Sequence, residues 1–128
     1  MVSAAHGRFH WNELMTRDVE AAKTFYSKMM GWVFDEMKAA DGVYYVGVKG
    51  DDLVGGISPM PKDMPADTPS YWLSYIEVDN VKALVGQVEA AGGTVLKAPA
   101  DIPDVGCIAI VRDPTGAVIG WITPDFHD

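Results

Sequence analysis

The stretch WNELMTRDVEAAKTFYSKMMGW, residues 11–32, carries the clearest fold signal in the chain. It continues an alternation of side chains that starts at residue 8 and predicts a half-buried strand over 8–16. Asp18 is suited to cap a helix, because its carboxylate can accept N–H groups of the first turn. Gly31 predicts the end of that helix in a left-handed conformation. Apolar residues between these two caps recur on one helix face: Val19, Ala22, Phe25, Tyr26, Met29 and Met30.

The same pattern returns further along the chain. Gly31 corresponds to Gly93 and Trp11 to Leu73, which in each case is a separation of 62 residues. Repetition at a fixed offset indicates two copies of one structural unit. We therefore expect two modules of about sixty residues, estimated from this repeat.

The remaining segments complete each copy of the module. Four prolines make 59–70 a linker between modules at about 8–58 and 71–123, because proline disrupts regular structure. Asn80 is the predicted cap of the second helix, whose buried face would hold Val81, Leu84, Val85, Val88 and Ala91. The predicted strands are 32–37, 43–49 and 53–58 in the first copy, and 71–78, 94–97, 106–112 and 117–123 in the second.

Two short segments carry more specific predictions. KAPADIPDVG, residues 97–106, is predicted to be a loop, and DPTG at 113–116 a turn. Gly55-Gly56 in a strand would permit the close approach of another backbone or a ligand.

The predicted fold class is α+β, with two βαβββ modules that form a cupped, barrel-like mixed sheet with the helices outside. A single sheet of this kind leaves one face uncovered, so the two modules would share a concave surface suited to a small molecule.

Composition restricts the partners. The 128 residues carry a net charge of −8, and their lysines and arginines are scattered, which argues against nucleic acid and an anionic membrane surface as partners. The single cysteine, Cys107, excludes an intrachain disulfide and fits a reducing compartment. No secretory signal or membrane-spanning segment is recognised. We therefore expect a cytoplasmic protein that forms a single domain.

The ordered set of motifs resembles the vicinal oxygen chelate superfamily, which includes glyoxalase I, bleomycin-resistance proteins and extradiol dioxygenases. The motifs are EL-T-D--AA--FY---MGW at 13–32, V-NVKAL---VEAAGGTVL at 78–96 and RDPTGAVIGW at 112–121. They cover essentially the whole chain, and the likeness is to glyoxalase-related single-chain members with a tryptophan in the first strand. The alternative is a ferredoxin-like α+β barrel, which needs only two strands after the first helix, so the strand at 53–58 argues against it.

The resemblance also implies where a metal would bind. The metal-dependent members hold one divalent ion with a side chain from each of strands one, four, five and eight. The corresponding positions here are Trp11, Gly56, Leu73 and Gly120. Indole, a leucine side chain and glycine offer no donor atoms to a divalent ion. We therefore expect no metal and no other cofactor, which argues against glyoxalase, dioxygenase and metal-dependent thiol-transferase activities.

An organic ligand is expected instead. If Trp11 faces the concave surface then so does Glu13, and Leu73 brings Tyr75 and Glu77 to the same side. The predicted ligand-binding residues are Trp11, Glu13, Gly56, Leu73, Tyr75 and Gly120. Aromatic walls with a few polar groups suit a mostly apolar ligand. Loss of hydration would raise the pKa of Glu13 and suit it to acid–base catalysis, although a structural hydrogen bond is the competing interpretation.

Other reactive residues are assigned structural roles. Trp32, Trp72 and Trp121 are interpreted as core or interface anchors. His6, His10 and His127 lie near the termini and are not interpreted as a metal site. Cys107 lies in an apolar strand with no adjacent histidine and is interpreted as an inert thiol.

Three functions are compatible with these residues. The first is a metal-free protein that binds a small apolar or aromatic compound, similar to bleomycin-resistance proteins. The alternative is a lyase- or isomerase-type enzyme that uses Glu13 as acid or base, or a metal held by residues outside the family positions. The third is a structural or regulatory domain that works through dimer contacts. A homodimer is expected from the family resemblance, while pairing of the modules within or between chains stays open.

Overall fold

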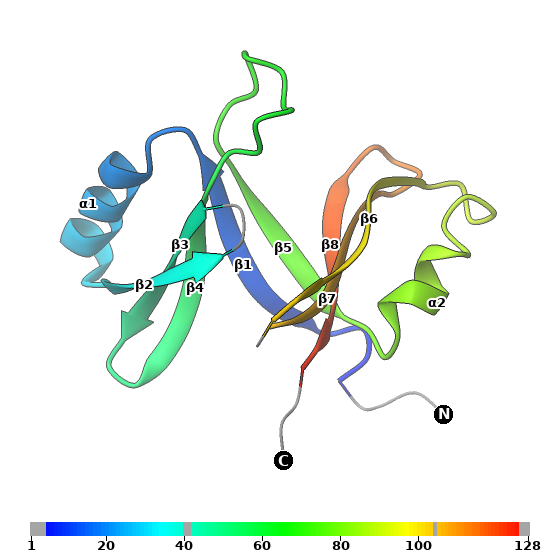
Figure 1. Cartoon of the computed structure of the whole chain (residues 1–128), viewed down its shortest axis with the longest axis horizontal. Coiled ribbons are helices and arrows are strands. Elements are labelled where there is room, and N and C mark those ends of the chain that lie inside the picture. Colours follow the sequence, from blue (N-terminus) through cyan, green and yellow to red (C-terminus); the bar gives the residue numbers. More distant parts are fainter. Residues whose placement is uncertain (1–4, 40–41, 104, 126–128) are drawn as a thin grey trace. The chain divides into compact units, whose positions relative to one another are not determined.

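The computed structural model describes residues 5–39, 42–103 and 105–125. The chain divides into two compact units. One, here called the first module, is Trp11–Leu73, and the other, the second module, joins Ser74 and the residues after it with those up to His10. Figure 1 shows each helix beside the strands of its own module.

The first module contains one long helix and a mixed sheet. Its elements are β1 (Phe9–Thr16, which begins in the other unit), α1 (Val19–Met30), β2 (Val33–Ala39), β3 (Gly42–Lys49) and β4 (Asp52–Pro59). The strand order is β2-β3-β4-β1, with β1 parallel to β4 and the other pairs antiparallel. The strands predicted for this module are therefore present.

Helix α1 begins and ends at the predicted residues. The Asp18 side chain accepts a hydrogen bond from the Ala21 backbone N–H at 3.0 Å. Gly31 has φ 74° and its N–H bonds to the Ser27 carbonyl, as expected of a left-handed cap. The packing differs from expectation, because no side chain of α1 is buried. On the predicted apolar face, Phe25 is 54% exposed and Met29 61%.

The proline-rich linker is held to the end of β1. The Arg17 guanidinium donates to the carbonyl oxygens of Thr68 and Pro65, the latter at 2.8 Å. The Ser70 hydroxyl donates to the buried hydroxyl of Thr16 at 2.8 Å. These hydrogen bonds fix the position of a segment that contains neither helix nor strand.

The second module has the same strand arrangement with a shorter helix. Its elements are β5 (Tyr71–Glu77, which begins in the first module), α2 (Val81–Val85), β6 (Thr94–Ile102), β7 (Gly106–Arg112) and β8 (Val118–Pro124). The order is β6-β7-β8-β5, with β5 parallel to β8 and the other pairs antiparallel. This repeats β2-β3-β4-β1 of the first module.

The second helix is shorter than predicted. Asn80 caps α2 through a bond from the Ala83 N–H at 3.1 Å, but the helix ends at Val85, before Gly86. Glycine has a low helix propensity, and the chain continues in turns in which Val88 bonds to Val85. Val88 is buried as expected, whereas the prediction that Ala91 is buried was wrong.

Strand β6 is longer than predicted. The segment expected to be a loop, 97–106, forms strand as far as Ile102 and pairs with β7. The register shifts between Val95 and Lys97 and again between Lys97 and Ala100. Such irregularities accommodate Pro99, which has no N–H to donate. Proline in this segment therefore indicated an irregular strand and not a loop.

The core of the second module lies under α2. Val78, Val81 and Ala109 are buried together, and Trp121 packs against them as the predicted core anchor. The Thr123 hydroxyl accepts from the Val81 N–H at 3.0 Å and donates to the Val78 carbonyl at 2.9 Å. These bonds tie the start of α2 to β8.

The predicted α+β class with two βαβββ modules and mixed strand pairing is confirmed. Strand β4 is the additional strand that a ferredoxin-like barrel does not need. The two described helices, α1 and α2, are not long and apolar enough to cross a membrane.

Candidate functional site

The predicted ligand-binding residues lie in both units. Trp11, Glu13, Gly56 and Leu73 belong to the first module, and Tyr75 and Gly120 to the second. The structure brings the first three of these together on paired strands, because Glu13 is opposite Gly56 in the β1–β4 register. Leu73 is buried, being 2% exposed.

Trp11 bonds to a tyrosine that sequence reasoning missed. Its indole N–H donates to the Tyr44 hydroxyl at 2.9 Å, and the bond is partly buried. An indole N–H is a donor only, so the phenol oxygen is the acceptor. The first strand therefore presents a donor at the position where the family resemblance places a metal ligand.

Gly56 provides the space for this tyrosine. A Cβ built at Gly56 would overlap the Tyr44 hydroxyl and the adjacent ring atoms. At the neighbouring Gly55, a Cβ would lie 3.2 Å from the Asn12 carbonyl oxygen of β1. The expected close approach at the glycine pair is thus made by a backbone at Gly55 and by a side chain at Gly56.

Glu13 lies close enough to two phenols to influence their ionisation. Burial, followed by the negative charge of Glu13, raises the pKa of Tyr44 far above its ordinary value, while the bond from Trp11 acts in the opposite direction. Burial and Glu13 likewise raise the pKa of Tyr71. A phenol is already protonated at neutral pH at its ordinary pKa, and the raised pKa keeps both hydroxyls protonated to higher pH, so both can donate hydrogen bonds.

A matching arrangement of glycine and tyrosine occurs in the second module. Tyr75 is 4% exposed and is opposite Gly120 in the β5–β8 register. A Cβ at Gly120 would overlap the Tyr75 ring. Glu77, which was expected to face the ligand, lies 3.2 Å from the His10 imidazole nitrogen Nδ1. Its carboxylate therefore has a protein partner.

Tyr44 and Tyr71 are the residues that the sequence interpretation omitted. A signal for Tyr44 was present, since Val46 pairs with Gly56 and Tyr44 is two residues before Val46 on the same face of β3. Tyr71 had no comparable signal. Its relation to Glu13 depends on the return of the chain after the linker, which no local pattern specifies.

The other tryptophans of the first module form an aromatic cluster. Trp32 stacks on Tyr26 with ring centroids 5.2 Å apart, and Trp72 meets the edge of the same Tyr26 ring at 5.5 Å. The Trp72 indole N–H also donates to the Tyr26 hydroxyl at 3.2 Å. This cluster packs α1 against neighbouring strands and supports the interpretation of Trp32 and Trp72 as anchors.

The histidines and the cysteine also have structural partners. His6 accepts the Asp79 backbone N–H at 3.0 Å, and His127 lies outside the described residues. No group of three or more His, Cys, Asp or Glu suited to a metal occurs within 5–39, 42–103 and 105–125. Burial and the nearby Asp101 raise the pKa of the Cys107 thiol, which favours the less nucleophilic protonated form.

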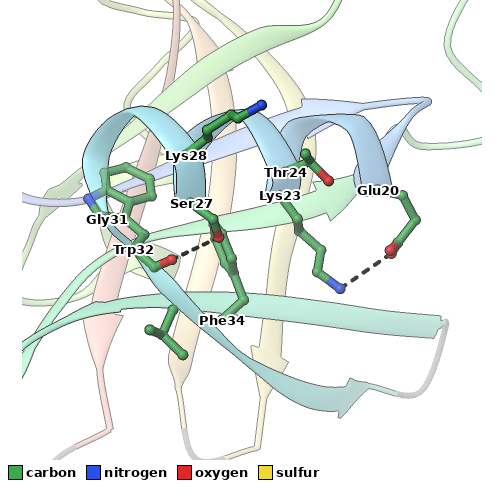
Figure 2. A pocket seen from close by; sticks show the side chains of 9 residues that line it. Glu20, Lys23, Thr24, Ser27, Lys28, Gly31, Trp32 and Phe34 are labelled. Carbon is green, nitrogen blue, oxygen red and sulfur yellow. Dashed lines mark hydrogen bonds and ion pairs between the residues drawn. The ribbon is translucent and has the colours of Figure 1, made fainter.

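Two surface hollows lie away from Trp11. The larger, of about 730 Å³, is beside α1 and the start of β2, and its lining residues are shown in Figure 2. Three of its polar side chains have protein partners: Ser27 donates to the Trp32 carbonyl at 2.8 Å, and Lys23 pairs with Glu20 at 3.3 Å. The smaller hollow lies between β6 and the end of β8. Because the larger groove is open and three of its polar side chains already have protein partners, the Trp11–Tyr44–Glu13 group is the stronger candidate site.

Comparison with known proteins identifies relatives over nearly the whole chain. The profile described as "Glyoxalase/Bleomycin resistance protein/Dioxygenase superfamily" matches residues 8–120. "Putative glyoxylase CFP32" of Mycobacterium tuberculosis (strain CDC 1551 / Oshkosh) is 39% identical over 94% of this chain and 47% of its own length. "Anthracycline biosynthesis protein DnrV" of Streptomyces peucetius is 30% identical over 91% of this chain and 47% of its own. The chain thus spans about half the length of these relatives.

A solved structure shows the same fold at low sequence identity. Methylmalonyl-CoA epimerase from Mycobacterium tuberculosis superposes with a TM-score of 0.68 and 10% identity, over 98% of this chain and 94% of the epimerase. At this identity the likeness concerns the fold alone.

Proposed function

This chain belongs to the glyoxalase/bleomycin resistance protein/dioxygenase superfamily, and from that premise we propose that it binds a small apolar or aromatic compound without a metal ion. The observation that carries the proposal is the side chain beside Gly56. Tyr44 fills the space that a strand-four metal ligand would need, and the Trp11 indole donates to its hydroxyl. The site therefore offers aromatic surface and hydrogen bonds to an organic compound.

The residues at the family's metal positions do not fit a divalent ion. Trp11 donates its N–H, Leu73 offers only carbon, and Gly56 and Gly120 carry no side chain. Divalent ions require several oxygen, nitrogen or sulfur donors in a defined geometry. We accordingly propose a ligand site that works without a metal.

The names of the relatives support small-molecule chemistry. One is named a glyoxylase and another an anthracycline biosynthesis protein. We propose that this chain, like them, serves the chemistry of small organic compounds. The full-length relatives are about twice as long as this chain. Test compounds should therefore include an anthracycline and simpler flat aromatic compounds.

Metal analysis and a ligand screen test this function together. Protein purified without chelator should contain far less than one divalent ion per chain, and a stoichiometric ion would overturn the proposal. Thermal unfolding in the presence of flat apolar compounds should show stabilisation, by about 2.7 kcal/mol at a hundredfold excess over Kd. A screen in which no compound class raises the unfolding temperature would also count against binding.

An enzyme that uses Glu13 is the second candidate, favoured by the position of its carboxylate near two phenols. A partly buried carboxylate beside protonated hydroxyls is suited to transfer a proton to or from a bound compound. Glu13→Gln keeps the shape of the side chain and removes the acid–base group. Once a reaction is found, this variant should lose activity by about 100-fold or more, and unchanged activity would exclude this role.

We also propose that the protein is a homodimer in which a second copy covers the apolar surface of α1. Support comes from exposure: of ten exposed large apolar side chains among the described residues, seven lie in the first module. Sedimentation should show a dimer that Phe25→Glu dissociates, because it places a charge on this surface. Thr24→Glu adds the same charge at an exposed position of the same helix and should leave the dimer intact. A monomeric wild type would refute the proposal.

Three further predictions remain part of this proposal. They are a single domain made of both modules, a cytoplasmic location and the absence of a nucleic-acid partner. The free thiol of Cys107 supports a reducing compartment. The net charge of −8 supports the absence of a nucleic-acid partner.

A further inference from the structure

The Tyr44 hydroxyl has a defined acceptor role within the protein. It receives the Trp11 indole N–H at 2.9 Å. A phenol can accept and donate at the same time, so this bond uses an oxygen lone pair and leaves the phenolic proton for another acceptor. In the part of the chain that the structure describes, the Tyr44 hydroxyl has no hydrogen bond in which it is the donor.

The position of this hydroxyl is set by its neighbours. The ring lies over Gly56, where a Cβ would overlap it, and Trp11 holds its oxygen from β1. Tyr45, the next residue on β3, faces the other way, with Lys23 Nζ 3.9 Å from its ring centroid. Tyr44 therefore presents a fixed donor on the face of the sheet opposite α1.

The negative charge near Tyr44 restricts which ligand group can accept a hydrogen bond from its hydroxyl. Glu13 is opposite Gly56, over which the Tyr44 ring lies, and its negative charge contributes to the raised pKa of both Tyr44 and Tyr71. The chain as a whole has a net charge of −8. A carboxylate or phosphate ligand would be repelled at this position, whereas a neutral carbonyl oxygen accepts a hydrogen bond without adding charge.

We infer that Tyr44 recognises the ligand through a hydrogen bond that its phenolic O–H donates to an uncharged carbonyl oxygen. The compound bound beside Trp11 is therefore a neutral ketone, aldehyde or related carbonyl compound with a flat apolar body. This inference rests on the proposed binding function and specifies its ligand class. The aromatic faces of Trp11 and Tyr71 contact the apolar body, and Tyr44 selects the carbonyl group.

Matched ligands and matched variants test this role. The ligands are 1-tetralone and tetralin, which share one bicyclic skeleton and differ by the carbonyl group, with fluorenone and fluorene as a second pair. The proteins are the wild type, Tyr44→Phe and Tyr45→Phe. Tyr44→Phe keeps the ring over Gly56 and removes only the hydroxyl, and Tyr45→Phe makes the same change on the opposite face of the strand. Binding is measured by titration calorimetry and folding by thermal unfolding.

The wild type should bind each ketone more tightly than its hydrocarbon partner. Tyr44→Phe should weaken ketone binding by about fivefold to tenfold, the loss expected for one neutral hydrogen bond, and leave hydrocarbon binding unchanged. Tyr45→Phe should change neither. In wild-type protein the carbonyl stretching frequency of bound 1-tetralone should fall below its value in an apolar solvent, a readout that needs no variant.

Two other results would overturn the inference in distinguishable ways. If wild type binds ketones and hydrocarbons equally and the carbonyl frequency is unshifted, Tyr44 does not select a carbonyl, although small-molecule binding stands. If neither compound of either pair binds, while the flat aromatic compounds in the screen also fail, the proposed function falls together with the inference.

Discussion

The two modules share a strand order but hold their helices differently. In the first module, α1 has twelve residues and no buried side chain, and Phe25 is 54% exposed. In the second, α2 has five residues, and Val81 at its first position is 1% exposed. The shorter helix is thus the better buried. Helix length is governed by local caps and breakers, while burial depends on what the rest of the fold places against the helix.

The modules also differ in how tightly each glycine–tyrosine pair is enclosed. Tyr75 over Gly120 is almost completely buried, whereas Tyr44 over Gly56 is half-buried and holds a polar group beside Glu13. The same glycine–tyrosine pair therefore contributes to packing in the second module and, in our proposal, to ligand recognition in the first. The following predictions test this contrast.

The largest effect is expected at the two glycines. Gly120→Ala should destabilise the protein by about 3 kcal/mol, because the added Cβ would overlap the ring of Tyr75, which is almost completely buried. Gly56→Ala should cost about 1–2 kcal/mol, because the half-buried Tyr44 ring can move towards solvent. Urea unfolding measures both. Gly86→Ala is the control and should be neutral or slightly stabilising, since Gly86 has φ −62°.

Truncation of one apolar residue in each helix should also cost different amounts of stability in the two modules. Val81→Ala should cost about 2 kcal/mol, because it leaves a cavity among Val78 and Ala109. Phe25→Ala should cost less than about 1 kcal/mol in the monomer, because the ring is mainly exposed. Chemical unfolding at protein concentrations below dimerisation gives both values, and equal losses would contradict the contrast.

The start of each helix offers a smaller comparison. Thr123→Val removes the hydroxyl that joins Val81 and Val78 and should cost about 1–2 kcal/mol. Asp18→Ala removes the cap of α1 and should cost about 1 kcal/mol. Hydrogen exchange of the helix amides would locate each loss, and a Thr123→Val effect confined to β8 would show that Thr123 does not hold α2.

The smallest effect concerns acid stability of the 113–116 turn in the second module. Hydrogen bonds from the Thr115 side chain, the Ala117 N–H and the Thr115 N–H hold the pKa of Asp113 below its ordinary value of 3.8. Because the folded-state pKa is the lower one, this stabilisation is complete above the unfolded-state pKa and is lost as pH falls through the folded-state pKa. The unfolding temperature of the wild type should therefore exceed that of Asp113→Asn at neutral pH, and the two values should converge in acid. A difference that is constant with pH would refute this cause.

Part of the site was visible in the sequence and part was not. Trp11, Glu13 and Gly56 were identified by strand alternation and by the family resemblance, and the structure places them on paired strands. Tyr44 was missed because its place over Gly56 depends on the register between β3 and β4, which alternation along β3 alone does not specify. Tyr71 depends on chain return after the linker, a non-local feature.

The sequence by itself determined the local features: the caps Asp18 and Asn80, the helix end at Gly31, the turn at Asp113 and the repeated order of elements. Each depends on residues a few positions apart, so a short stretch contains the whole signal. Only the tertiary structure decided that β6 extends to Ile102, that α1 stays exposed and that Tyr44 occupies the space over Gly56. These features depend on contacts between residues distant in sequence, and their energies exist only once the strands have paired.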